Sequence, residues 1–237
     1  QTFSVLYVAL LREEHWSRAD TAGIYSMAML TSGVTVVLSG MLLPRLGPRR
    51  LMALAAAFAG VGLILSSQAT GLLDLYLTYG VIAAVGLGIM SWVVQGAILA
   101  PYFTARLGLA NGIAFAGMGI GVLVLAGLMQ GLIETLGWRM ALLALGAGVG
   151  ITGMIINMLT MPSDLGAFTA KIEEGKGHRA LRMKALTGAL RGVPFWALFT
   201  VLTLTSAASY GAANHQAACI VDIGFSPRVG AIVVAIN

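Results

Sequence analysis

The stretch that decides the fold runs from Tyr102 to Gly117 and reads YFTARLGLANGIAFAG. After Arg106 the charged residues stop, and apolar residues continue well past the end of the stretch. Gly117 and Gly121 have the small-xxx-small separation that lets two membrane helices approach closely. We therefore expect a bare helix-packing face that includes Gly112, Gly117 and Gly121. Such a face would serve equally for static packing and for helices that move against each other.

The composition is that of a membrane protein. Of the 237 residues, 58% are hydrophobic and 10% are charged, and the mean hydropathy is +0.90. A soluble domain carries about 25% charged residues, so these charges are too few to cover a water-facing surface. The net charge of +5 comes from basic residues in short connections between apolar runs. This pattern favours a positive-inside bias over nucleic-acid binding.

Apolar runs long enough to cross a bilayer follow one another along the chain. A hydrocarbon core roughly 30 Å thick needs about 20 apolar residues at 1.5 Å of rise each. The runs predict the tail of a first helix at 1–11, full-length helices at 21–43, 50–69, 73–103, 109–136, 138–161 and 193–221, and the start of an eighth near Phe225. The chain opens and stops inside apolar runs, so we expect it to be a piece of a longer protein.

One long polar segment, 162–192, divides these helices into two groups. It is either a linker with some helix or a short amphipathic helix on the membrane surface. The predicted organisation is an N-terminal six-helix half at 1–161, this linker, and the start of a second half at 193–237. Two six-helix halves around a central site describe the major facilitator fold, an all-α membrane architecture.

The basic residues predict the orientation of the helices. Alternate connections hold ten Lys or Arg residues, three in 44–50, one in 104–108 and six in 162–192. The remaining connections hold four, which are Arg12, Arg18, Arg139 and Arg228. The positive-inside rule therefore places the first set in the cytoplasm, and the first helix runs from inside to outside.

The opening stretch also carries a family resemblance. Tyr102–Gly117 resembles the fifth-helix signature of monocarboxylate transporters, which reads Tyr-Phe, a basic pair, then Leu-Ala-x-Gly-x-Ala-x-Ala-Gly. Ala105 departs from it, because the family usually has Lys there. The Gly-Trp-Arg at 137–139 is similar to the family's start of helix six, and the Trp-Ser-Arg at 16–18 resembles bacterial members and the related oxalate/formate antiporters. The likeness is close over about residues 10–162 and looser over 193–237.

A second motif, GMLLPRLGPRR at 40–50, resembles the major facilitator signature between helices two and three, Gly-x-x-x-Asp-Arg-x-Gly-Arg-Arg. Its glycines permit a tight turn, and its arginines could latch one state of a cytoplasmic gate or serve only to orient the chain. Pro44 replaces the family's Asp, so the usual acid–arginine relay is absent. The predicted gating residues are Gly40, Arg45, Gly47, Arg49, Arg50 and Arg106.

Polar side chains inside apolar helices are costly and are therefore candidates for function. The candidate substrate-binding residues are Trp92, Gln95, Tyr210, Asn214 and His215. Trp92 and Gln95 share a helix face, as do Tyr210 and Asn214. The resemblance places Trp92 where bacterial relatives often carry a cavity-facing Tyr. His215 could donate to a carboxylate, couple transport to protons, or simply satisfy a neighbouring helix, and Trp92 could simply pack.

Several kinds of chemistry have no support in this sequence. The single cysteine, Cys219, excludes a disulfide or a cysteine metal site within the chain. The helices hold no paired carboxylates, His-rich metal motif or activated Ser, so we expect neither an enzyme nor a bound cofactor. No helix has a basic residue at its centre, although a buried carboxylate needs one. The resemblance implies that helices one and eight supply it, and the chain holds only parts of these.

The leading hypothesis is a multi-pass protein of the cell membrane that acts as a secondary active transporter of a small organic anion. It would work by alternating access, driven by protons or by exchange, with a small carboxylate and the lipid bilayer as partners and no nucleic acid. One alternative is a major facilitator transporter of an unrelated solute. Another is a membrane sensor that has the same fold and no transport activity.

The orientation can be tested by labelling. Cysteines introduced at Lys176 and at Asp74 of a full-length protein should react with membrane-impermeant reagents from opposite sides, with Lys176 on the cytoplasmic side. Labelling of both positions from outside would overturn the assignment.

Overall fold

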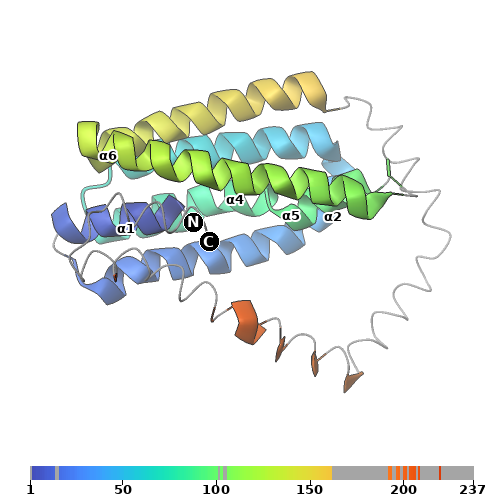
Figure 1. Ribbon diagram of the computed structural model, residues 1–237, viewed down its shortest axis with the longest axis horizontal. Coiled ribbons are helices and arrows are strands. Elements are labelled where there is room, and N and C mark those ends of the chain that lie inside the picture. The colour runs from blue at the N-terminus through green and yellow to red at the C-terminus, as the bar shows by residue number, and fades with distance from the viewer. Residues whose placement is uncertain are drawn as a thin grey trace.

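A computed structural model describes residues 2–13, 16–100, 102–103 and 106–161, together with separate residues between 192 and 208 and Cys219 (Figure 1). Within these ranges every regular element is a helix, and the helices form one bundle. The linker predicted at 162–192 and most of the helix predicted at 193–221 lie outside the described residues.

The elements in chain order are α1 (Thr2–Glu13), α2 (Arg18–Ser67), α3 (Leu72–Leu77), η1 (Thr78–Ala83), α4 (Ala84–Ile89), α5 (Trp92–Leu99) and α6 (Leu107–Thr160). Within the described residues three stretches are long and apolar enough to cross a membrane, at Ala19–Ser67, Leu72–Leu99 and Leu107–Thr160. α2 has 50 residues and α6 has 54. At 1.5 Å per residue each would be about 75–80 Å long, more than twice the bilayer core.

Both long helices fold back at a glycine. Gly47 has φ 74° and ψ 166°, and Gly137 has φ 79° and ψ 164°. This part of conformational space is essentially restricted to glycine. α2 therefore consists of two arms, 18–46 and 48–67, and α6 of two arms, 107–136 and 138–160, which run in opposite directions (Figure 1). These arms confirm the helices predicted at 21–43, 50–69, 109–136 and 138–161.

The helix predicted at 73–103 is instead divided into segments. α3 passes into η1, a π-helix of six residues, and then into α4. The helix breaks after α4, where Met90 has φ −74° and ψ 2° and Ser91 has φ −60° and ψ 154°. α5 then continues to Leu99. Hydropathy could not predict this break, because neither Met nor Ser interrupts an apolar run as Pro does.

Close backbone contacts hold the centre of the bundle together. A Cβ added at Gly86 of α4 would lie 2.3 Å from the backbone nitrogen of Ala59, and one at Gly62 would lie 2.3 Å from that of Ala83. A Cβ at Gly60 would lie 2.9 Å from the carbonyl oxygen of Gly146 in the second arm of α6. Only glycine permits these distances, so the second arm of α2 is the element around which its neighbours pack.

The predicted glycine face of α6 is different. Among the described residues, no atom lies within 4 Å of a Cβ added at Gly112, Gly117 or Gly121. The first arm of α6 also exposes large apolar side chains, among them Ile113 and Ile120. The described helices therefore do not cover this face, and its role in helix packing stays a prediction.

The two glycine turns should be intolerant of any side chain. Gly47→Ala and Gly137→Ala should each destabilise the protein by about 1–3 kcal/mol, because alanine would be forced into a strained backbone conformation. The melting temperature of the purified full-length protein would measure this. Gly33→Ala is the matched control, because Gly33 is helical with no atom within 4 Å of an added Cβ among the described residues. An equal loss in all three variants would contradict the assigned turns.

Candidate functional site

Two of the predicted substrate-binding residues lie on α5. Trp92 is 58% exposed, and its ring meets Phe115 of α6 edge to face, with centroids 6.0 Å apart and planes at 88°. Gln95 is also exposed, and its Nε2 donates to the carbonyl oxygen of Met90 at 2.8 Å. Both residues therefore lie in the first turn of α5, directly after the helix break, and Trp92 contacts the first arm of α6.

The same contact contains buried polar atoms without a partner. Among the described residues, Ser91 Oγ and Asn111 Oδ1 are buried and accept or donate no hydrogen bond. A Cβ added at Gly96 would lie 3.9 Å from both amide atoms of Asn111, so this side chain packs directly on α5. An unpaired buried polar atom costs about 1–3 kcal/mol, and native structures retain few of them. The contact thus holds unused hydrogen-bonding capacity in apolar surroundings.

Asn111 was not predicted as a site residue. The available signal was that it is the only polar side chain between Leu107 and Met129. The rule that intramembrane polar residues are candidates for function should have selected it together with Trp92 and Gln95. We group Ser91, Trp92, Gln95 and Asn111 as the α5–α6 polar cluster.

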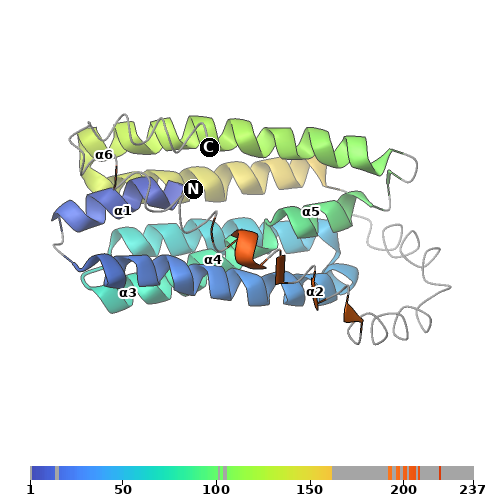
Figure 2. The same cartoon turned by 60° about the horizontal axis from the view of Figure 1, so that its bottom comes forward.

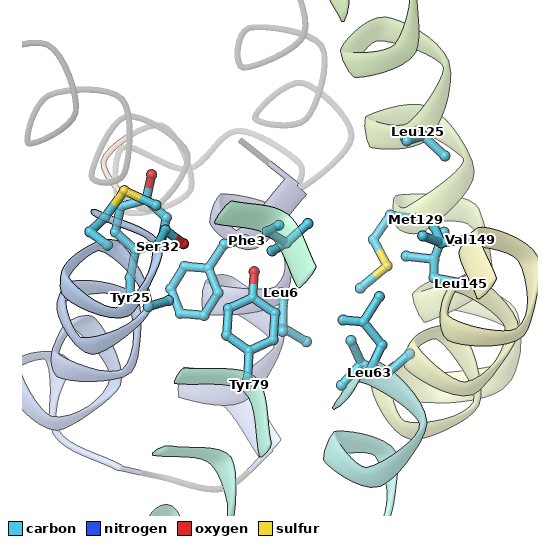
Figure 3. Close-up of a pocket in the computed structure, with 14 residues that line it drawn as sticks. Phe3, Leu6, Tyr25, Ser32, Leu63, Tyr79, Leu125, Met129, Leu145 and Val149 are labelled. Carbon is cyan, nitrogen blue, oxygen red and sulfur yellow. The ribbon is translucent and has the colours of Figure 1, made fainter. Parts of the chain in front are cut away.

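A separate cavity of about 230 Å³ lies deeper in the bundle. Figure 3 shows Phe3, Tyr25 and Tyr79 on one side of it and Leu125 and Met129 among the residues on the other. The Phe3 ring centroid is 5.2 Å from that of Tyr25 and 5.2 Å from that of Tyr79. Neither of the predicted substrate-binding residues that the structure describes, Trp92 and Gln95, lines it.

The chemistry of this cavity does not suit a free carboxylate. Its lining is mainly aliphatic and aromatic, with the hydroxyl groups of Ser32, Tyr25 and Tyr79 as its side-chain polar groups. The hydroxyl of Ser32 already donates to the carbonyl oxygen of Ala84 at 3.1 Å. No basic side chain among the described residues lines the cavity, and an unpaired anion is costly to bury. The cavity fits an apolar group better than an anion.

The charged side chains of the described residues lie at the two ends of the bundle, and the acidic ones share their end with Arg139. Arg45, Arg49, Arg50 and Arg106 lie at the end where α2 folds back at Gly47 and α6 begins, the arginine end. Asp20, Asp74 and Glu134 lie at the opposite end, where α6 folds back at Gly137. Figure 2 shows α5 at the first of these ends and α3 at the second.

The predicted gate residues make few contacts within the described part of the chain. Arg45, Arg50 and Arg106 are exposed, and Arg49 is half-buried. None of them forms an ion pair with an acidic residue there, because the described acidic side chains all lie at the other end. Gly40 is exposed with no described atom within 4 Å of an added Cβ, whereas Gly47 forms the turn. The latch therefore stays a prediction, while the turn is confirmed.

One interhelical hydrogen bond ties α6 to the arginine end. Asn157 is 5% exposed, and its Nδ2 donates to the carbonyl oxygen of Arg49 at 2.8 Å. At the other end Arg139 Nη1 donates to the carbonyl oxygen of Ala69 at 2.6 Å, and its guanidinium lies 4.5 Å from the centroid of the Trp138 ring. These bonds fix the second arm of α6 against α2 at both ends.

The predicted binding residues of the seventh helix, Tyr210, Asn214 and His215, lie outside the described residues. The structure therefore does not test their role in substrate binding, which remains a prediction.

The fold defines an all-α, multi-pass integral membrane protein. The family model described as Major Facilitator Superfamily matches residues 1–237, so the chain belongs to this superfamily. Within it the chain is similar to monocarboxylate transporters.

Three relatives illustrate the similarity. Monocarboxylate transporter 12 of Homo sapiens is 39% identical over 153 residues, which cover 62% of this chain and 29% of that protein. Monocarboxylate transporter 11 of Homo sapiens is 35% identical over 156 residues, covering 64% and 33%. Monocarboxylate transporter 3 of Gallus gallus is 32% identical over 157 residues, covering 66% and 28%. The matched region spans a third or less of each relative's length.

The packing of α5 on α6 predicts a size limit at Gly96. An added Cβ there would make ordinary contact with Asn111, so Gly96→Ala should change stability by less than about 0.5 kcal/mol. Gly96→Leu would push the two helices apart and should cost about 1–3 kcal/mol. Melting temperatures of the full-length protein would measure both.

Gly108→Leu is the matched control, because Gly108 lies in the same arm of α6, is exposed, and has no described atom within 4 Å of an added Cβ. A Gly96→Leu variant as stable as Gly108→Leu would refute the contact.

Proposed function

We propose that this chain is part of a secondary active transporter that carries a small organic anion, a monocarboxylate or a close relative, across the cell membrane. The proposal rests first on membership of the major facilitator superfamily and on similarity to monocarboxylate transporters over about 62% of the chain. Proton coupling and exchange are both compatible with it.

The α5–α6 polar cluster supports the proposal because it contains hydrogen-bond donors that a carboxylate could use. It offers an amide at Asn111, an amide at Gln95 and a hydroxyl at Ser91, on or against the helix that carries the exposed ring of Trp92. Amide N–H groups and the Ser91 hydroxyl can donate hydrogen bonds to carboxylate oxygens, whereas the unpaired Asn111 Oδ1 can only accept. The Ser91 hydroxyl, which lacks a partner among the described residues, is what a carboxylate substrate could satisfy. The cluster would form one wall of the site, and a basic residue of another helix would pair with the charge of the anion.

The uncovered face of α6 supports the alternating-access part of the proposal. In this fold the substrate lies between two halves that rock against each other. A face with Gly112, Gly117 and Gly121, which no described helix covers, suits contact with a second half that moves. Small residues permit a close approach without interlocking side chains that would resist sliding.

One observation favours a second candidate, a membrane sensor with the same fold. Pro44 stands where the superfamily signature has Asp, and none of the gate arginines pairs with a described acidic residue. A weakened latch would impair a transport cycle more than it would impair binding. A sensor would bind an organic anion without moving it across the membrane.

The proposed function can be tested with the full-length protein in liposomes. Uptake of radiolabelled L-lactate should be saturable and should accelerate under an inward proton gradient or with unlabelled lactate inside the vesicle. Trp92→Ala should raise KM severalfold, because it removes an aromatic wall of the site. Trp92→Phe should stay close to the starting value, because a phenyl ring still reaches Phe115.

The controls separate the alternatives. Glycerol, a neutral solute of similar size, should give no saturable uptake. Binding of lactate without flux would indicate a sensor, and saturable glycerol uptake would indicate an unrelated solute. An unchanged KM in Trp92→Ala would remove this residue from the site.

A further inference from the structure

The break between α4 and α5 leaves one hydroxyl without a partner. The N–H of Ser91 bonds to the carbonyl of Gly88, three residues back, where a continuous helix would bond four residues back. Its backbone is extended, with ψ 154°. Its Oγ is buried, makes no hydrogen bond within the described part of the chain, and does not cap α5.

Other hydroxyls in the spanning helices behave differently. A Ser or Thr inside a helix commonly donates to the carbonyl four residues before it. Ser39 does so to Thr35 at 2.7 Å, and Ser66 does so to Gly62 at 2.7 Å. In a continuous helix Ser91 would have the same acceptor, the carbonyl of Leu87. The hydroxyl is therefore unpaired because the helix is broken, and straightening the helix would pair it.

Gln95 stabilises the broken form. Its Nε2 donates to the carbonyl of Met90 at 2.8 Å, which is the acceptor that the N–H of Val94 would use in a continuous helix. The broken form thus gains one side-chain bond from Gln95 and loses one at Ser91. These two side-chain hydrogen bonds are of comparable strength and favour opposite forms.

The segments on the two sides of the break are held differently. α4 is locked by backbone contacts, since an added Cβ would lie 2.3 Å from Ala59 at Gly86 and 2.9 Å from Ser32 at Gly88. In α5, a Cβ added at Gly96 would meet only the Asn111 side chain within 4 Å among the described residues, at 3.9 Å. α5 is held mainly by apolar side chains, which can slide over their neighbours. Movement at the break would therefore displace α5 and leave α4 in place.

We propose that Ser91 is a positioning residue, a hinge at which α5 exchanges between the observed broken form and a straight form continuous with α4. In the straight form the Ser91 hydroxyl bonds to the carbonyl of Leu87 and Gln95 loses its bond to Met90. The Gln95 amide is then free for substrate, and Trp92 moves relative to Phe115. The use of this exchange in a transport cycle rests on the proposed function, but the exchange itself does not.

Opposite shifts from two substitutions would test the hinge. In the full-length protein with Cys219 replaced by Ser, spin labels at Ala97 and Leu38, both exposed, would report the position of α5 relative to α2 by pulsed electron resonance. Two distances are expected. Ser91→Ala should reduce the straight population about tenfold, because it removes the hydroxyl that only this form satisfies. Gln95→Leu should raise it about fivefold, because it removes the bond that only the broken form makes.

Two controls make the result specific. Labels at Leu77 and Leu38 should give one unchanged distance in every variant, because Leu77 is exposed and precedes the break. Ser91→Thr retains a hydroxyl and should give the same populations of the straight and broken forms as Ser91. A single Ala97–Leu38 distance in all variants, or shifts of Ser91→Ala and Gln95→Leu in the same direction, would overturn the hinge. These populations are measured without substrate, so a failure of lactate flux leaves the hinge result standing.

Discussion

The structure depends above all on the closeness with which backbones meet along the second arm of α2. The glycines Gly60, Gly62 and Gly86 let η1, α4 and the second arm of α6 approach this arm so closely that an added Cβ would lie 2.3–2.9 Å from a backbone atom of the neighbour. In a bilayer the lipid is as apolar as the side chains, so helices gain little from burying leucine and much from dispersion and geometric fit. The positions of α4 and of the second arm of α6 follow from these contacts, and through them the place of the α5–α6 polar cluster.

Much of the fold could be predicted from the sequence, because a bilayer imposes one strong constraint on length and polarity. The apolar runs located the arms of α2 and α6, and the glycine-containing motif at 40–50 located the turn at Gly47. The division of the span between Leu72 and Leu99 could not be predicted, since a π-helix and a break at Ser91 depend on tertiary contacts that hydropathy does not record.

The role of the site residues stays a prediction. Trp92 and Gln95 share helix α5, and Asn111, which packs against this helix, was not predicted although it is the only polar side chain between Leu107 and Met129. Gly112, Gly117 and Gly121 show the opposite limit. Their spacing predicts a packing face, but spacing cannot identify the partner, and the glycines that pack within the described bundle lie elsewhere. The spacing of small residues predicts that a helix can pack closely, but which helix it packs against depends on the whole fold.

The two glycine turns have a further meaning. Gly47 and Gly137 adopt nearly the same backbone angles, each is followed two residues later by an arginine, and they lie at opposite ends of the bundle. Inverted repeats of three helices are built into each half of this superfamily, and two equivalent turns at opposite ends of the bundle match that arrangement. The arginines that follow the two turns have different surroundings: Arg139 donates to the carbonyl of Ala69, while Arg49 has no ionic partner among the described residues.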